Sequence, residues 1–338
     1  MQNFNWYRTD LIDESEEVVV HQTKEQKEKL KQSSGVQIED RTAGRVKITD
    51  VLVDGEGEKQ IGKKEGQYIT LSVPTLTLED QDGFVQLEQE LLENFKKLHE
   101  SLSWQEDDKI LIIGLGNRTI TPDAIGPYLI DHLHSLDVID EKFVMYAPGV
   151  TGQTGYETGE FVAAIAERLK PKLVIVVDAL ATRASNRLCK TIQLTNTGIH
   201  PGSGVGNQRQ EISYEMLGIP VTAIGIPTVV DAPVLIADAV EVMLRSIAAR
   251  VAERSNPSSK LSLSSWQPNI DKELDMSLVE PIFGEWATWT REERQQLFEE
   301  TFAASHRQLM VTPKEADYWI DRYANLVASM LMKWASDL

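Results

Sequence analysis

The apolar residues in the middle of the chain form short continuous runs, each bounded by polar sequence. Such runs are typical of strands buried on both faces of a parallel sheet. They predict strands over 109–113, 143–147, 173–177 and 221–226, and a further strand is predicted over 191–195. Between and after these runs, apolar positions recur at helical spacing and predict helices over 122–136, 158–169 and 232–253. The alternation of strand and helix predicts an α/β fold, a doubly wound three-layer α/β/α sheet.

A different pattern precedes this core. Apolar and polar residues alternate over 46–53 and again over 68–73, and a turn-like sequence with two glycines separates the two runs at 54–57. Alternation around such a turn predicts a hairpin or a small mixed sheet. Residues 79–103 then return to helical spacing. We therefore expect a β-rich N-terminal section added to the α/β core.

The C-terminal part is predicted to be helical. The stretch 255–280 is rich in Ser, Asn and Pro and is expected to be a surface linker. Capping-box sequences at 290–293 and 312–315 predict two helix starts, the second with a proline at its first helical position. Apolar residues at helical spacing after 315 predict that the last helix packs one face on the body of the protein.

Composition narrows the function classes. The chain has 338 residues, of which 41% are hydrophobic and 25% charged, as in soluble globular proteins. Its net charge of -18 argues against direct binding to nucleic acid, because the surface repels phosphate. The single cysteine, Cys189, excludes an internal disulfide and cysteine-rich zinc sites, which favours a reducing, cytoplasmic setting. We expect no signal peptide and no membrane span, since the sequence contains neither pattern.

Two aspartates are the first candidates for chemistry. Asp123 follows the predicted strand 109–113 and a glycine-rich turn, and Asp178 directly ends the apolar run of the predicted strand 173–177. The carboxyl ends of parallel strands meet at one edge of a sheet, where open α/β folds build their sites. Two carboxylates in unlike surroundings can act as general acid and general base around one water molecule.

Structural roles remain open for both residues. Asp123 is also suited to the first turn of a helix after Thr121 and Pro122, where the helix dipole favours a negative charge. Asp178 is also suited to be a buried cap or an ion-pair partner of Arg183. The spacing of the two aspartates along the chain does not establish that they are close.

Other candidate sites have weaker support. The turn at 114–117 lacks the third glycine of a dinucleotide fingerprint, and the glycine-rich stretch 200–207 lacks the Lys-Ser/Thr of a P-loop. His200 is a candidate metal ligand, but no second histidine stands at a metal-binding spacing. Cys189 lacks the surroundings that mark a nucleophilic cysteine.

Several segments together resemble the germination protease family of spore-forming bacteria, also called spore protease or GPR endopeptidase. They include Gly-Leu-Gly-Asn at 114–117, Thr-Pro-Asp-Ala at 121–124, Asp-Ala-Leu-Ala at 178–181, Thr-Gly-Ile-His-Pro-Gly-Ser-Gly-Val-Gly-Asn at 197–207, Gly-Ile-Pro-Thr-Val-Val-Asp-Ala at 225–232 and Leu-Met-Val-Thr-Pro-Lys-Glu at 309–315. The resemblance covers essentially the whole chain. It implies an atypical aspartic endopeptidase that degrades small acid-soluble spore proteins in the spore core during germination, with Asp123 and Asp178 as its essential aspartates.

The resemblance implies further properties. The fold is similar to that of hydrogenase-maturation proteases, the members assemble as homotetramers, and no metal or other cofactor takes part. The family is made as a zymogen that removes its own N-terminal peptide, and the sequence Arg-Thr-Asp-Leu at 8–11 places the cut between Asp10 and Leu11. The implied organisation is a propeptide, 1–10, and a single protease domain, 11–338. That domain comprises a β-rich section at 36–75, an α/β core at 105–255 and C-terminal helices at 281–338.

The sequence departs from the family pattern in two places. The stretch between the two aspartates is shorter than expected, near 136–143, and Asn196 stands where an acidic residue is expected. Two rival functions remain: a metal-dependent peptidase resembling the hydrogenase-maturation proteases, and a non-catalytic spore protein that binds other proteins.

Overall fold

The computed structural model describes residues 35–136, 142–150, 157–201, 210–253, 275–304 and 309–338. Contacts divide the chain into two compact units. The first contains the described residues up to Thr182, together with Asn186–Val229 and Thr312–Leu338. The second contains Arg183–Ser185 and Val230–Val311.

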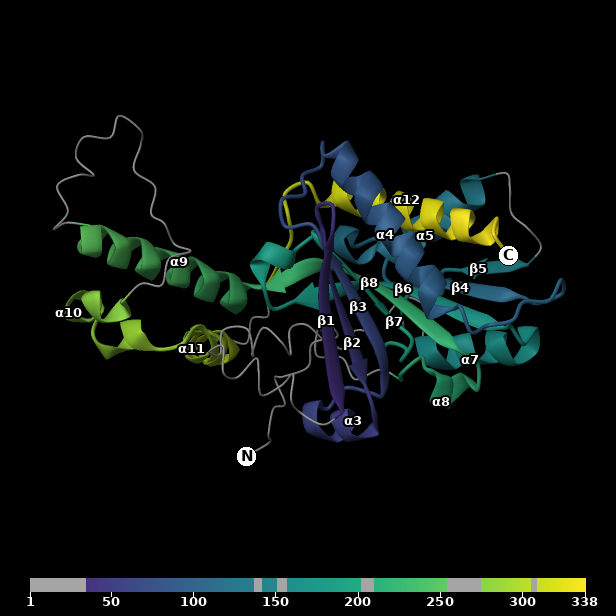
Figure 1. Cartoon of the computed structure of the whole chain (residues 1–338), viewed down its shortest axis with the longest axis horizontal. Coiled ribbons are helices and arrows are strands. Elements are labelled where there is room, and N and C mark those ends of the chain that lie inside the picture. Colours follow the sequence, from purple (N-terminus) through teal and green to yellow (C-terminus); the bar gives the residue numbers. More distant parts are fainter. Residues whose placement is uncertain (1–34, 137–141, 151–156, 202–209, 254–274, 305–308) are drawn as a thin grey trace. The chain divides into compact units, whose positions relative to one another are not determined.

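A mixed β-sheet forms the centre of the first unit (Figure 1). Its order is β1-β2-β3-β7-β8-β6-β4-β5. The short β9 belongs to the second unit and pairs with Val230 and Asp231, the last two residues of β8, which belong to that unit as well. The strands β4, β5 and β6 are parallel, whereas β1, β2, β3, β7 and β8 pair antiparallel in that sequence. Their bounds are β1 Val36–Ala43, β2 Val46–Val53, β3 Gly66–Ser72, β4 Ile110–Gly114, β5 Phe143–Tyr146, β6 Leu173–Thr182, β7 Thr191–Thr195, β8 Val221–Asp231 and β9 Met310–Val311.

Helices cover both faces of this sheet, so the predicted three-layer α/β/α fold is confirmed. One face packs against α4 (Gln81–Leu98), α5 (Ile125–Ser135) and α12 (Ala316–Ala335). The other packs against α7 (Thr158–Leu169) and α8 (Tyr214–Leu217). Alternate residues of each central strand point to opposite faces of the sheet. In β4, Ile110 and Ile112 face the layer of α4, α5 and α12, whereas Leu111 and Ile113 face the layer of α7 and α8.

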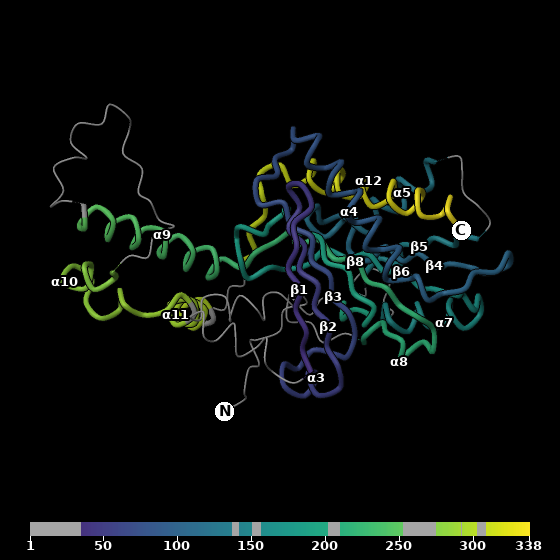
Figure 2. The backbone as a smooth tube through the Cα atoms, in the orientation of Figure 1, coloured from purple at the N-terminus to yellow at the C-terminus, as the bar shows by residue number. Residues whose placement is uncertain are grey.

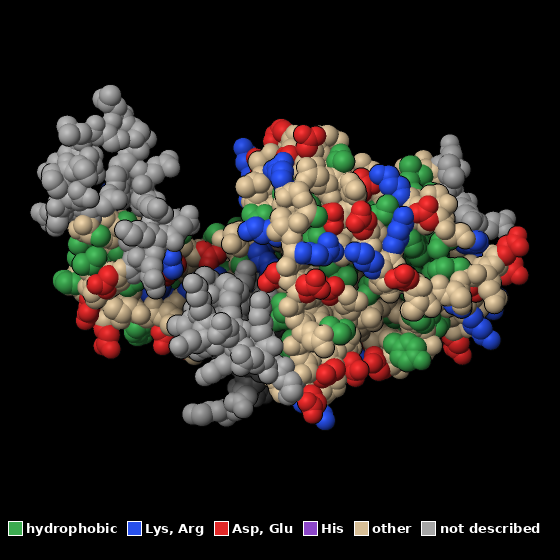
Figure 3. All heavy atoms as spheres, in the orientation of Figure 1, with side chains coloured by type: hydrophobic (Ala, Val, Ile, Leu, Met, Phe, Trp, Pro, Cys, Tyr) green, Lys and Arg blue, Asp and Glu red, His purple; other side chains and the backbone are tan. Residues whose placement is uncertain are grey.

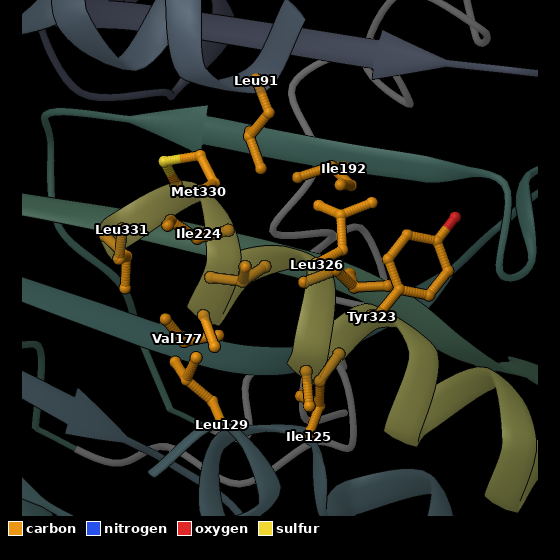
Figure 4. Close-up of a cluster of buried hydrophobic side chains, with 14 of the residues drawn as sticks. Leu91, Ile125, Leu129, Val177, Ile192, Ile224, Tyr323, Leu326, Met330 and Leu331 are labelled. Carbon is orange, nitrogen blue, oxygen red and sulfur yellow. The ribbon is translucent and has the colours of Figure 1, made fainter. Parts of the chain in front are cut away.

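The first layer has the larger core (Figure 4). Ile125 and Leu129 of α5 and Tyr323 and Leu326 of α12 belong to this core and are all buried, and Leu129 lies beside Val177 in the view. Val177 of β6 and Ile224 of β8 approach the same cluster from the sheet. This packing holds α5 against α12 and the sheet, and so fixes the start of α5, which lies beside the candidate site described below.

The β-rich N-terminal section is present, but its predicted turn is wrong. The strands β1, β2 and β3 lie side by side (Figure 2), and β2 pairs antiparallel with β3 as expected. Residues 54–57 form no hairpin turn; they begin a short helix, α3 (Gly55–Ile61), which connects the two strands. Asp54 caps α3, because its carboxylate accepts from the backbone N–H groups of Glu56 and Gly57 at 2.9 and 3.1 Å.

The second unit is built from helices: α9 (Ala232–Glu253), α10 (Glu280–Phe283), α11 (Arg291–Ala304), and the 3₁₀ turns η5 (Met276–Leu278) and η6 (Glu285–Thr288). The helices predicted together over 281–338 thus fall into both units, since α12 belongs to the first. Whether 11–338 acts as one protease domain stays a prediction. The capping box at 290–293 is confirmed: the Thr290 N–H donates to the Glu293 carboxylate at 2.7 Å, and the Glu293 N–H donates to the Thr290 hydroxyl at 3.2 Å.

The charges on the described surface and the polarity of the described helices are two further properties of the structure. In the orientation of Figure 3, acidic and basic side chains are interspersed on the described surface of the first unit. Among the described residues, every helix is too short or too polar to cross a lipid bilayer.

Candidate active site

Asp178 lies in β6, on the face of the sheet that packs against α7. Val174 and Val176 share this face, whereas Val177 points to the opposite layer. The Asp178 side chain is only 6% exposed, and its Oδ1 accepts a hydrogen bond from the N–H of Ala179 at 2.9 Å. A carboxyl group this deeply buried needs partners or a function, because burial of an unpaired charge is costly.

Asp123 lies in a different kind of element. It ends the 3₁₀ turn η1 (Thr121–Asp123), and α5 begins two residues later at Ile125. The predicted single helix over 122–136 is therefore wrong at its start, and Thr121 provides no side-chain cap. Asp123 is partly exposed, in contrast to Asp178.

The glycine-rich turn after β4 holds Asp123 in place. The N–H of Asn117 donates both to the backbone oxygen of Asp123, at 3.0 Å, and to its carboxylate Oδ2, at 2.9 Å. Gly116 has φ 112°, and a Cβ there would lie 1.9 Å from the Asp123 carbonyl oxygen. Only glycine fits at this position, because both the positive φ and the close approach exclude a side chain.

The two aspartates come from neighbouring strands. β4 and β6 pair in parallel up to Gly114 and Val177, and the N–H of Leu115 continues the ladder by donating to the Val177 oxygen at 2.8 Å. Asp178 is the next residue of β6, and η1 contacts the same strand. Asp178 is the sixth of the ten residues of β6, level with the end of β4, so the predicted end of this strand at 177 is wrong. The catalytic pair and a water molecule shared between its carboxyl groups stay a prediction.

Other residues singled out from the sequence have different surroundings. Asp10, Leu11 and the glycine-rich residues 202–207 lie outside the described residues. His200 is exposed, with its Nε2 3.4 Å from a carboxylate oxygen of Glu211. Among the described residues, no group of three or more His, Cys, Asp or Glu side chains is placed to hold a metal ion. Burial raises the pKa of the Cys189 thiol to about 12, which does not suit a nucleophile.

Sequence reasoning missed several buried polar residues of the sheet. Thr70, Thr191 and Gln193, on β3 and β7, lie on the same face of the sheet as Asp178. The sequence pattern that could have identified these three residues is a polar residue at every second position of an otherwise apolar strand. Thr228 of β8 was also missed as a separate residue, although it lies within the segment 225–232 that carried the family resemblance. Its contact is with Pro122, which is 106 positions away in the sequence.

The arrangement suits acid–base chemistry. One carboxyl group is buried on a sheet face, and the other is partly exposed and receives a backbone N–H. Two carboxyl groups in surroundings this different suit a division of roles into one acid and one base.

Comparisons with known proteins agree over almost the whole chain. The family model described as germination protease matches residues 12–335. The germination protease of Geobacillus sp. (strain WCH70) is 39% identical over 342 aligned residues, covering 96% of this chain and 92% of the relative. That of Priestia megaterium (strain ATCC 12872 / QMB1551) is 36% identical over 341 residues with the same coverage.

Solved structures give a weaker similarity. The [NiFe] hydrogenase maturation protease HycI from Thermococcus kodakarensis KOD1 is 21% identical with a TM-score of 0.26, covering 36% of this chain and 74% of that one. The hydrogenase maturating endopeptidase HybD from E. coli is 14% identical with a TM-score of 0.25, covering 61% and 99%. The family match and the close relatives, each aligned over nearly its full length, show that this chain belongs to the germination protease family.

Proposed function

We propose that this protein is an endopeptidase that begins the degradation of small acid-soluble spore proteins in the spore core during germination. The observation that carries the proposal is that Asp178 of β6 directly follows the residue paired with the end of β4, and that Asp123 lies in η1, which follows β4 along the chain and contacts β6. Membership of the germination protease family supports the same activity.

The proposed mechanism is that of an atypical aspartic peptidase. The ionised carboxylate, assigned to Asp123, removes a proton from a water molecule whose oxygen attacks the carbonyl carbon of the peptide. The protonated carboxyl group, assigned to Asp178, donates its proton to the leaving nitrogen as the C–N bond breaks. The products are a carboxylic acid and an amine, and return of the proton from Asp123 to Asp178 restores the pair. The two carboxyl groups titrate as a pair, so the assignment describes the starting protonation state of the dyad.

The decisive experiment replaces each aspartate by the isosteric, non-ionising asparagine. Asp123→Asn and Asp178→Asn should each lower kcat for cleavage of a small acid-soluble spore protein by at least about 10²-fold, the usual contribution of a general acid or base. Asp131→Asn is the matched control, because Asp131 is an aspartate on α5 whose side chain is half exposed and paired with Arg118. Near-normal rates in either dyad variant would refute the mechanism.

Self-processing gives a second readout of the same chemistry. We propose that the chain is made as a zymogen and cuts itself between Asp10 and Leu11. Mass spectrometry of the incubated full chain should show loss of residues 1–10, whereas Asp178→Asn should leave the chain intact. Loss of cleavage in excess chelator would instead favour the metal-dependent alternative. Binding of spore proteins without any fragments would favour the non-catalytic alternative.

We further propose that the protein acts as a homotetramer without a cofactor. Sedimentation equilibrium should then give four times the chain mass of 37.9 kDa. A monomer that cleaves at the full rate would refute the functional need for this assembly.

A further inference from the structure

Two segments that carried the family resemblance have no role in the dyad itself. They are 225–232, which forms the end of β8 and the first residue of α9, and 309–315, which leads into α12. Each contains a threonine whose hydroxyl makes a long-range hydrogen bond in the first unit: Thr228 and Thr312.

Thr228 connects β8 to the turn that carries Asp123. Its side chain is 1% exposed, and its Oγ1 donates to the backbone oxygen of Pro122 at 2.6 Å. Pro122 directly precedes Asp123 in η1, so this hydrogen bond fixes the peptide group from which Asp123 extends. The turn has no side-chain cap, and its own hydrogen bonds run from the Asp123 N–H to the Ile120 oxygen at 2.8 Å and from the Ala124 N–H to the Thr121 oxygen at 3.1 Å.

Thr312 supports Thr228 from the other side. Its Oγ1 donates to the backbone oxygen of Thr228 at 2.9 Å. This use of the hydroxyl explains why the predicted capping box at 312–315 is absent: α12 begins only at Ala316, and no side chain caps it. The segment before α12 therefore holds the backbone of β8 at the position from which Thr228 reaches η1.

The remaining constraints on Asp123 come from its other neighbours. The Asn117 N–H holds its carboxylate Oδ2, and Ala124 and Ile125 are buried against the core formed with α12 (Figure 4). These contacts act at the end of the turn, on Asp123 and on the residues that follow it. The Thr228 hydroxyl acts one residue earlier, on the Pro122 oxygen, and together with the hydrogen bond from the Asp123 N–H to the Ile120 oxygen at 2.8 Å it fixes the peptide group from which Asp123 extends.

We propose that Thr228 is a positioning residue for Asp123, and that its hydroxyl keeps the Asp123 carboxylate in the orientation required for proton transfer. The inference rests on the proposed role of Asp123 in catalysis. Proton transfer needs heavy atoms within hydrogen-bond reach, and a misplacement of about 1 Å can cost about 10²-fold in rate. Thr228 itself touches no reacting atom.

The test compares two substitutions that differ in the hydroxyl group. Thr228→Val keeps the shape of the side chain and removes the donor; it should lower kcat for spore-protein cleavage by roughly 10- to 100-fold and change KM less than about twofold. Thr228→Ser keeps the donor and should retain at least about a third of the wild-type kcat.

Thr222→Val is the matched control. Thr222 lies in the same strand, is equally buried, and directs its hydroxyl to His99 instead of to η1. Its substitution removes a buried hydroxyl from β8 and should leave kcat within about twofold of wild type. If Thr228→Val has the same kcat as Thr222→Val, or if Thr228→Ser is as impaired as Thr228→Val, the positioning role is wrong.

A further variant covers the case in which Thr228→Val does not fold. Thr312→Val leaves the Thr228 hydroxyl intact and removes only the support of its backbone, so we expect kcat to fall by about threefold with KM unchanged. An unchanged kcat would contradict the proposal. The Asp123→Asn variant distinguishes failure of the catalytic proposal from failure of the positioning proposal. Full activity of Asp123→Asn refutes the dyad, whereas failure of the Thr228 prediction alone leaves the dyad standing.

Discussion

His99 is a buried residue whose protonation is linked to stability. It is 5% exposed and lies at the end of α4, in the core of the first unit. Its Nδ1 lies 2.7 Å from the Phe95 carbonyl oxygen and must donate to it, so its Nε2 accepts from the Thr222 hydroxyl at 2.8 Å. Both contacts are satisfied by the neutral ring, and burial lowers the pKa of His99 to about 4.

We predict a loss of stability in mild acid that depends on His99. The unfolded chain takes up a proton near the ordinary pKa of 6.5 and the folded chain only near 4, so stability falls as the pH drops through this range. Between pH 7.5 and pH 5, urea unfolding should show a loss of about 2 kcal/mol from this residue. His99→Leu should lose correspondingly less over the same interval. An equal pH dependence in wild type and variant would contradict the assignment.

At the scale of single residues, local sequence was sufficient to select Asp123 and Asp178. Asp178 directly ends an apolar run, and Asp123 follows another after a glycine-rich turn; both patterns are visible in a short stretch of sequence. Thr228 and Asn117 were not predicted as residues that hold Asp123. Threonine and asparagine occur in many loops and strands, and the contact from Thr228 to Pro122 depends on β8 lying near η1 in the folded sheet.

Between elements, a buried ion pair joins α9 to α11 in the second unit. The guanidinium group of Arg294 is 2% exposed; it pairs with Glu241 of α9 and donates to the backbone oxygen of Trp289 at 2.5 Å. The same Glu241 carboxylate also pairs with Arg245, one turn further along α9, whose side chain is 40% exposed. One carboxylate thus has a buried partner and an exposed partner, which gives a matched comparison.

We predict that Arg294→Met destabilises the second unit by about 3 kcal/mol, because it leaves a largely buried carboxylate with only its exposed partner. Hydrogen exchange should become faster in α9 and α11 and remain unchanged in α4. Arg245→Met should cost less than about 1 kcal/mol, since an exposed ion pair contributes little. Equal effects of the two substitutions would show that burial of the pair does not matter.

Some helices and strands were predicted well from the sequence, and others were not. The helix over 232–253 and the strand over 191–195 have the predicted bounds. The helix has a long periodic pattern, and the strand is a short alternation of polar and apolar residues. The capping box at 290–293 formed and the one at 312–315 did not, although the local signals were alike. The difference is tertiary: the hydroxyl of Thr312 is taken by the Thr228 carbonyl of β8, a partner that no local pattern reveals.

For the whole molecule, the sequence predicted the class of fold but not the division into units. Alternation of strands and helices is enough to predict a sheet covered on both faces. The order of the strands places β7 and β8 between β3 and β6, and it joins the β-rich section to the α/β core in one sheet. That order depends on pairings between distant segments, which apolar periodicity does not encode.

Net charge is a property of the whole chain with its own consequence. A charge of -18 produces a negative field that attracts basic peptides and repels acidic ones, and salt screens this effect. We predict that two peptides with the same residues around the scissile bond, one flanked by lysines and one by glutamates, differ in kcat/KM by about tenfold at low salt in favour of the basic peptide. The difference should nearly vanish in about 0.5 M salt, where the Debye length is only a few ångströms. A preference that persists at high salt would indicate direct contacts with the flanking residues, and a preference for the acidic peptide would contradict steering by net charge.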